Sequence, residues 1–342
     1  MPSVDSSIDW GASYSCGWRV LAIDPASWQP TGTVDGIVSA SCTRDATGLV
    51  LESGTLEADG EVGDREMWVR VELTARQAGA ERAPVLTMLA IPAPSEVRRG
   101  RSTARYDLHS VLKPAADVHL LAGAHVPAGA DAAAAAVGLI AQCTPAPVSA
   151  DGGFRLSEPY VFARGTTNLE AASMLVGAAG WCIQVETDGS VHVRRMPADP
   201  ALVIGRGSGL LGPSVEPDDG NMGAPNRYVA VEGGSTAVAE DADPESPTST
   251  VARGRVVEVY DDAPTRVGGE SLDEYARRRL AELTGAVGRR SYTRAWVPGI
   301  TLNDVIVGEM PEASLSCRMR VVHQVLNLGA EMTVSEECEV LR

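Results

Sequence analysis

Residues that could carry out chemistry are few and scattered along this chain of 342 residues. The five histidines and six cysteines include no His-Glu-x-x-His, Cys-x-x-Cys or Gly-x-Ser-x-Gly segment, the spacings of zinc, redox and nucleophile sites. Cys182 and His192 fall on the two strands of one expected hairpin, which would allow a thiol–imidazole pair. No third orienting group or oxyanion hole accompanies them in the sequence, so we expect no catalytic residue, no metal site and no cofactor.

Two loops match ligand-binding motifs only in part. Gly205–Gly209 follows a strand-like segment, as a phosphate loop does, but it lacks the Gly-Lys-Ser/Thr end and a following helix. We therefore interpret it as a connector between domains. Thr55–Gly60 with Glu66 copies part of a calcium-loop spacing, but Thr replaces the first Asp and both flanks are strand-like. This second segment is expected to belong to a β-hairpin.

The charge of the chain is strongly negative. A formal net charge of −16 argues against a dedicated DNA-binding surface, because such binding depends on neutralising phosphates. Paired carboxylates for glycoside hydrolysis need a fixed separation on rigid elements. The densest acidic stretch is instead rich in Gly, Pro and Ser, so we expect a solvated acidic loop over 232–250. Its region has one base, Arg227, and eight acids: Glu216, Asp218, Asp219, Glu232, Glu240, Asp241, Asp243 and Glu245.

The cysteines and the N-terminus bear on the compartment. The first ten residues have neither the basic nor the apolar region of a secretory signal. The longest apolar stretch, Ala132–Ile140, is about half the length that a membrane-spanning helix needs. We therefore expect buried, reduced thiols in a protein that assembles in the cytoplasm. The cysteines are Cys16, Cys42, Cys143, Cys182, Cys317 and Cys338.

The elements that would position these groups fall into three regions. Residues 15–115 contain about six short strands with no long helix between them, which is typical of a small barrel or sandwich. In Met67–Leu73 apolar residues alternate with polar ones, as in a strand with one buried face. Residues 1–14 form an N-terminal arm before this region.

Residues 116–212 indicate a compact α+β domain. Asp131 precedes an alanine-rich helix, and Thr167 with Glu170 then forms a capping box that begins a second helix. Asp188-Gly189 between apolar runs is typical of a tight β-hairpin.

Residues 213–342 return to strands. Ser271 and Glu274 form a second capping box, which begins a helix over 271–287 with its apolar residues on one face. Two strands precede this helix and four follow it. The sequence therefore predicts a mainly β fold, in which two β-barrels, 15–115 and 213–342, flank the small α+β domain.

In this order the segments resemble a tail-tip or baseplate hub protein of tailed bacteriophages, over nearly the whole chain. The opening is similar to minor tail proteins from phages of actinobacteria, and the ending is similar to the second tube domain of such hubs. The motifs that carry the resemblance define shape rather than catalysis. They are Trp18-Arg19-Val20, Asp24-Pro25, Trp28, Leu51–Gly54, Asp241–Thr248 as an acidic loop, Ala276–Leu280 and Trp296–Val305.

The resemblance implies a homotrimer. Each chain would supply two β-barrel tube domains to a ring of pseudo-sixfold symmetry at the virion tail tip, assembled in the host cytoplasm. The ring would join the tail tube and the distal tail protein ring to the tip or central fibre proteins, and would close around the C-terminus of the tape measure protein. Genomic DNA would pass through without specific binding, with acidic walls repelling its phosphates. Contact with the host envelope would be indirect, and both a non-contractile tail and a contractile injection device fit.

Two other functions stay open at this point. A cell-wall hydrolase, either a peptidase or a glycosidase, would need a convergent nucleophile or metal cluster, and none is recognisable in the sequence. A glycan-binding receptor module would need aromatic residues gathered on loops, whereas most of the 15 aromatics fall in expected strands. We therefore expect a structural protein and not an enzyme.

Overall fold

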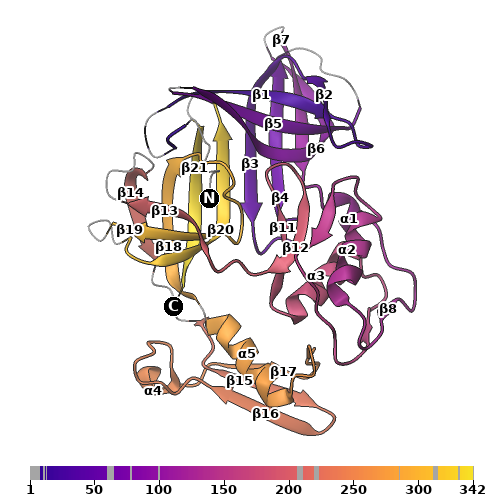
Figure 1. Cartoon of the computed structure of the whole chain (residues 1–342), viewed down its shortest axis with the longest axis vertical. Helices are drawn as coiled ribbons and strands as arrows, with labels where there is room; N and C mark the ends of the chain where they lie inside the picture. The colour runs from indigo at the N-terminus through magenta and orange to yellow at the C-terminus, as the bar shows by residue number, and fades with distance from the viewer. Residues whose placement is uncertain are drawn as a thin grey trace.

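The computed structural model describes most of the chain between residues 8 and 341 (Figure 1). The large sheet fills the upper part of Figure 1, an α+β unit lies beside it, and a second, small α+β unit lies at the lower end. The residues outside the description are 1–7, 11, 13, 60–64, 78, 99–100, 206–210, 219–222, 285, 311–314, 330–331 and 342.

The large sheet contains thirteen strands, drawn from both ends of the chain. Its hydrogen-bonded order is β14-β18-β21-β20-β3-β4-β7-β6-β5-β1-β2, and β19 pairs with both β20 and β13 beside this path. The first group of strands is β1 Ser15–Ile23, β2 Pro30–Thr33, β3 Ile37–Asp45, β4 Glu52–Asp59, β5 Met67–Arg76, β6 Ala80–Arg98 and β7 Arg101–His109. The last group is β13 Pro200–Gly205, β14 Leu211–Asp218, β18 Ala286–Ala295, β19 Val305–Glu309, β20 Arg318–Leu328 and β21 Met332–Leu341.

The two groups meet where β3 pairs antiparallel with β20, and we call this pairing the seam (Figure 1). Cys42 lies opposite Leu326 across the seam, and both side chains belong to one buried cluster. The mainly β fold is thus confirmed, but its two β units share one sheet instead of standing apart. Pairing at the seam satisfies the backbone of two strands that would otherwise be exposed edges. The number of barrels stays a prediction.

The α+β unit follows the first group of strands and uses the expected start signals. Thr167 and Glu170 form both hydrogen bonds of the capping box, and Asp131 caps the alanine-rich helix through the backbone N–H groups of Ala133 and Ala134. Both helix starts confirm the local predictions. The unit comprises α1 Lys113–Asp117, β8 His125–Val126, α2 Ala132–Ala141, β9 Val148–Ala150, β10 Tyr160–Val161, α3 Asn168–Ala178, β11 Trp181–Val185 and β12 Val191–Arg195.

The expected hairpin of β11 and β12 anchors this unit to the large sheet. The backbone carbonyl of Asp188 at its turn accepts hydrogen bonds from Trp28 Nε1 at 3.0 Å and from Arg70 at 2.8 Å. Gly189 has a φ of +80° and lies so close to Thr87 and Trp28 that a Cβ there would approach their atoms to within 2.9 Å. We call Trp28, Arg70 and Thr87 the hairpin socket.

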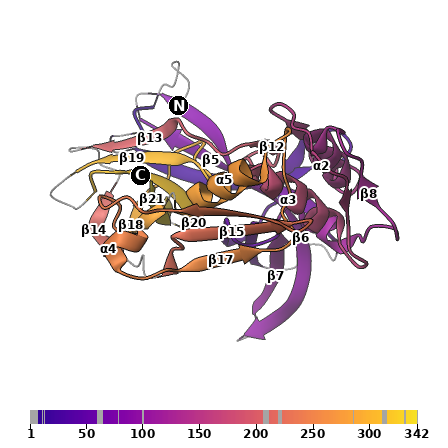
Figure 2. The same ribbon diagram turned by 90° about the horizontal axis from the view of Figure 1, so that it is seen from below.

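The small unit has one sheet, ordered β16-β15-β17, and one long helix. Helix α5 begins at the expected capping box of Ser271 and Glu274 and lies over one face of this sheet (Figure 2). Its buried residues Tyr275, Ala276 and Leu280 pack on that face. The elements are β15 Arg227–Glu232, β16 Ser235–Glu240, α4 Thr250–Arg253, β17 Glu258–Asp261 and α5 Leu272–Thr284.

The placement of this helix differs from the sequence-based expectation. The predicted second barrel included helix 271–287, but α5 belongs to the small unit and ends at Thr284. Val287 lies in β18 of the large sheet. The apolar stripe of the helix is recognisable in the sequence. The sheet on which it packs is not, because the apolar face of the small sheet forms only when its three strands pair.

Two loop predictions also differ. The expected loop 232–250 contains strand β16, because Gly233 and Gly234, both with positive φ, make a two-residue turn between β15 and β16. The hairpin expected around Thr55–Glu66 is absent from the described pairings. Strand β4 pairs with β3 and β7, and β5 pairs with β1 and β6. Both segments are strands, but β4 and β5 do not pair with each other.

Candidate functional site

One face of the large sheet is turned to the core and the other is less buried, as strand alternation requires. Along β21, Val334, Glu336 and Cys338 are buried, whereas Ser335 and Glu337 are partly exposed. The cross-strand pairs show that this less buried face continues from β21 and β20 across the seam to β3 and β4. We call it the open face, and it includes Ser39, Ser41, Thr43, Asp45, Ser53, Thr55, Glu57, Arg105, Asp107, Arg289, Ser291, Thr293, His323, Val325, Asn327, Thr333, Ser335, Glu337 and Glu339.

Short hydroxyl side chains dominate the open face on both sides of the seam. Ser41 and Thr55 share a hydrogen bond of 3.0 Å between β3 and β4. Thr293 and Ser335 share one of 2.9 Å between β18 and β21. Because such hydroxyls bond to each other, these positions are polar without carrying a charge.

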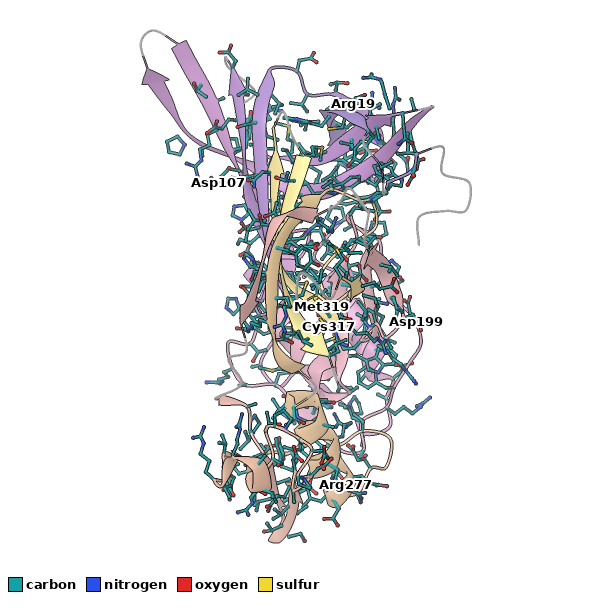
Figure 3. All side chains as sticks on the ribbon, turned by 90° about the vertical axis from the view of Figure 1, so that its left-hand side faces the viewer. Arg19, Asp107, Asp199, Arg277, Cys317 and Met319 are labelled. Atoms are coloured by element: carbon teal, nitrogen blue, oxygen red, sulfur yellow. The ribbon has the colours of Figure 1, made fainter. Side chains whose placement is uncertain are left out.

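The charges on the open face are mostly negative. Arg105 and Arg289 on this face are paired with Asp107 and Glu337 (Asp107 is labelled in Figure 3). Hydrogen bonds from the Thr47 hydroxyl and backbone N–H lower the pKa of Asp45, so this carboxyl stays ionised at neutral pH. The carboxylates on this face include Asp45, Glu57, Asp107, Glu337 and Glu339.

A hollow of about 320 Å³ lies in the open face, where β18, β21 and β20 run side by side. Its lining includes the hydroxyls of Ser291, Thr293 and Ser335, the ring of His323, the carboxylate of Glu337 and the side chain of Val325. The lining holds no group of three metal-ligating side chains, and no such group occurs elsewhere in the part of the chain that the structure describes. Its chemistry is therefore that of a hydrated surface.

A row of buried polar residues lies on the opposite, core face, directly across the seam. Glu52, Arg44, Gln324 and Glu336 are consecutive cross-strand partners on β4, β3, β20 and β21. Arg44 Nε donates to Glu52 at 2.7 Å and Gln324 Nε2 donates to Glu336 at 2.7 Å. Arg294 on β18 completes the row by donating to both oxygens of Glu336, at 2.8 and 2.6 Å. We call these five residues the buried row.

The buried row divides the core of the large sheet. Leu326 and Val334 lie on one side of it with the first β unit, and Val321 and Cys338 lie on the other side. Burial raises the pKa of Glu52, against the opposing attraction of Arg44. Two arginines and two glutamates balance, so the row places no net charge in the interior.

The structure does not bring Cys182 and His192 into contact. Cys182 lies opposite Arg194 in the hairpin, and His192 lies opposite Gln184. Burial raises the pKa of the Cys182 thiol to about 11, which keeps it protonated and unreactive at neutral pH. The buried Gln184 donates instead to Thr301 at 2.8 Å, which joins the α+β unit to the loop before β19.

The structure places a serine–histidine–aspartate group around His192 that sequence spacing did not suggest. Ser190 Oγ lies 3.4 Å from His192 Nε2, and Asp151 Oδ1 lies 3.3 Å from His192 Nδ1. The Ser190 hydroxyl donates to Asp188 at 2.7 Å, so its proton is directed away from the ring. None of these three residues lines the hollow in the open face, and the group lacks the geometry of an activated nucleophile.

The remaining sequence candidates are distributed without a common site. Residues 206–210 of the phosphate-like loop lie outside the described residues. In the acidic stretch, Glu240 is paired with Arg227 on neighbouring strands, and Glu232 is paired with Arg266. The side chains of Glu216, Asp218 and Asp219 lie outside the description. Cys42, Cys182 and Cys338 are buried, and the other three cysteines are half-buried.

Comparison with known proteins identifies the fold. No protein-family model and no curated protein matches the chain. Among solved structures, the tail protein from Neisseria meningitidis MC58 has a TM-score of 0.71 at 12% identity and covers 96% of this chain and 97% of that one. The 43 kDa tail protein of prophage MuSo2 from Shewanella oneidensis has a TM-score of 0.67 at 13% identity, covering 95% and 98%.

A third similar structure is prophage tail protein gp18 from Listeria monocytogenes EGD-e, with a TM-score of 0.56, 8% identity and 94% coverage of both chains. The chain therefore has the fold of phage tail proteins over nearly its whole length, which confirms the general resemblance seen in the sequence. The narrower resemblance to proteins of actinobacterial phages stays a prediction. In the described residues, none of the helices has the length and hydropathy to cross a membrane.

Proposed function

We propose that this chain is a structural, non-enzymatic component of a phage tail, and that its open face lines the channel of a ring at the tail tip. The fold supports the tail assignment. The observation that carries the channel assignment is the composition of the open face, where hydroxyls and carboxylates continue through the seam over both β units.

Such a surface suits passage of DNA rather than its capture. Phosphate binding depends on unpaired Arg and Lys side chains, and Arg105 and Arg289 of the open face are already paired with carboxylates. Ionised Asp45 and its neighbours repel phosphate, and the short hydroxyls keep the wall hydrated. Three copies would complete the ring, which would connect the tail tube and distal tail protein to tip or fibre proteins and enclose the end of the tape measure protein.

The test replaces open-face hydroxyls by arginine. We expect particles with Thr55→Arg and Thr293→Arg to assemble normally but to eject DNA more slowly, because the new cations attract phosphate. The delay should be larger at low salt, since about 0.1 M salt screens exposed charges beyond about 10 Å. Ejection is followed with a DNA-binding dye after receptor or chemical triggering, and tail assembly is checked by electron microscopy.

The matched control is Ala134→Arg, which adds a cation on the exposed side of α2, away from the open face. This control should leave the ejection rate unchanged. Equal ejection rates for all three variants would show that the open face does not line the channel. Absence of the chain from purified particles would reject the tail assignment itself.

A further inference from the structure

The sheet of the small unit has two faces with different surroundings. Tyr228 and Ala230 of β15 point to α5 and are buried with Ala237 and Ala239 of β16. The hydroxyls of Tyr228 and Tyr275 both donate to Asp261 at 2.7 Å, which fixes the helix on this side. The face toward α5 is therefore complete.

The opposite face carries an apolar row in the described structure. Val229 on β15 lies opposite Val238 on β16 and opposite Tyr260 on β17, so the three side chains stand side by side. Val238 is 55% exposed and Tyr260 is 62% exposed. Helix α5 lies on the other side of the sheet, and no described element packs on this row (Figures 1 and 2).

Strand β15 has the sequence of a strand covered on both faces. Tyr228, Val229, Ala230 and Val231 are four successive apolar residues, whereas a strand with one solvated face alternates apolar and polar residues. One of the two apolar faces is satisfied by α5, and the other has no cover within the described chain. The strand composition thus indicates a second layer supplied from outside.

The charges around the row define what can cover it. On the same three strands, two residues from the apolar row, Arg227 lies between Glu240 at 2.7 Å and Glu258 at 3.8 Å, so this border has an excess of negative charge. Residues 226–284 contain twelve carboxylates and seven arginines. A second copy of the chain would bring the same acidic surface against this one, which like-charge repulsion disfavours.

We infer that the face formed by Val229, Val238 and Tyr260 docks a different protein, one that presents apolar side chains bordered by lysine or arginine. Three strands about 4.8 Å apart and about five residues long give this face of the sheet an area of about 250 Å². A stable pair of proteins buries about 800 Å² per partner, so this contact forms within an assembly that other contacts already hold together. The inference rests on the proposed function for the presence of that assembly.

The experiment places a photo-reactive phenylalanine analogue at Val238 or Tyr260 of the full chain in assembling particles. We expect both positions to cross-link to the same second protein, through a peptide that contains lysine or arginine. The control position is Arg277, exposed on α5 on the other side of the small unit (Figure 3), and it should not give that product.

Charge reversal provides the second arm of the test. Glu240→Lys with Glu258→Lys should lower the cross-link yield from Val238 about tenfold, because a basic partner would then meet like charge. Cross-links to another copy of this chain, or none from either position in particles that contain the chain, would overturn the inference. Particles that lack the chain would instead reject the proposed function.

Discussion

At the scale of single residues, the buried row is the feature that departs most from an apolar core. Arg294 and Glu336 are joined by two hydrogen bonds and their side chains are 1% and 0% exposed. Buried pairs of this kind add little to stability over an apolar replacement, but they are costly to break. Arg44 lies opposite Gln324 across the seam and donates to it at 3.3 Å, so the row favours a single alignment of the two β units.

Removing the cation of this pair should be strongly destabilising. Arg294→Met leaves Glu336 buried with Gln324 as its remaining donor, and we expect a loss of about 3–5 kcal/mol in the free energy of unfolding. Urea denaturation followed by circular dichroism measures the change. The control Arg289→Met removes a half-exposed partner of Glu337 and should cost at most about 1 kcal/mol.

The double variant Arg294→Met/Glu336→Leu separates pairing from packing. It should recover most of the lost stability, because apolar side chains of similar volume can replace a buried ion pair. A double variant as unstable as Arg294→Met alone would contradict this account and assign the cost to lost packing.

The thiols provide a second residue-scale expectation. Burial raises the pKa of Cys42 to about 12 and that of Cys182 to about 11. Since the thiolate is the reacting form, both should react slowly with an aromatic disulfide at pH 8 and faster as the pH rises toward those values. The half-buried Cys16, Cys143 and Cys317 should react before these two, and all six thiols should react after denaturation. Rapid reaction of Cys42 in the folded protein would be inconsistent with its burial.

At the scale of elements, one hairpin turn positions a whole unit. The Asp188-Gly189 pair predicts a tight turn. In the structure the same turn packs in the hairpin socket, where the carbonyl of Asp188 accepts hydrogen bonds from Trp28 and Arg70. The positive φ of Gly189 and its contacts with Trp28 and Thr87 make two separate demands on this position. Local turn geometry and attachment of the α+β unit therefore depend on the same glycine.

A pair of glycine variants separates these demands. Gly189→Ala should lower the free energy of unfolding by about 1–3 kcal/mol more than Gly234→Ala, because overpacking adds to the strain of a positive φ. Gly234 has a similar φ of +86°, and a Cβ added there would have no neighbouring atom within 4 Å. Thermal and urea unfolding measure both variants. Equal losses would mean that the socket accommodates a methyl group without resistance.

At the scale of the whole molecule, the seam makes one sheet from the two ends of the chain. Each copy therefore presents two β units side by side with a continuous open face. A ring built from such copies needs half as many chains as a ring whose subunits each carry one β unit. Closed rings are the usual form of symmetric oligomers.

Three copies per particle are therefore the expected stoichiometry against a sixfold tail tube. Native mass spectrometry of the assembled ring, or a reconstruction of the tail tip, counts the copies directly. The isolated chain and the chain mixed with neighbouring tail proteins serve as comparison samples. Six copies or a single copy would contradict the arrangement.

The sequence determined the local structure where the responsible residues are neighbours in the chain. Capping boxes at Thr167 and Ser271 and the turn at Asp188 act over two to four residues, so their elements were predictable. Strand alternation likewise assigned the strands and the mainly β fold. The resemblance to tail proteins rested on the order of such segments and agrees with the fold.

Tertiary structure alone decided which elements pair. The seam joins Arg44 to Gln324, 280 residues apart, and α5 packs on a sheet that the sequence indicated as part loop. A hydrophobic pattern predicts that one face of an element is buried. It does not predict which other element covers that face, because the hydrophobic effect is non-directional. For the same reason, the open face and the apolar row of the small unit could be identified only from the tertiary structure, which shows which faces other elements cover.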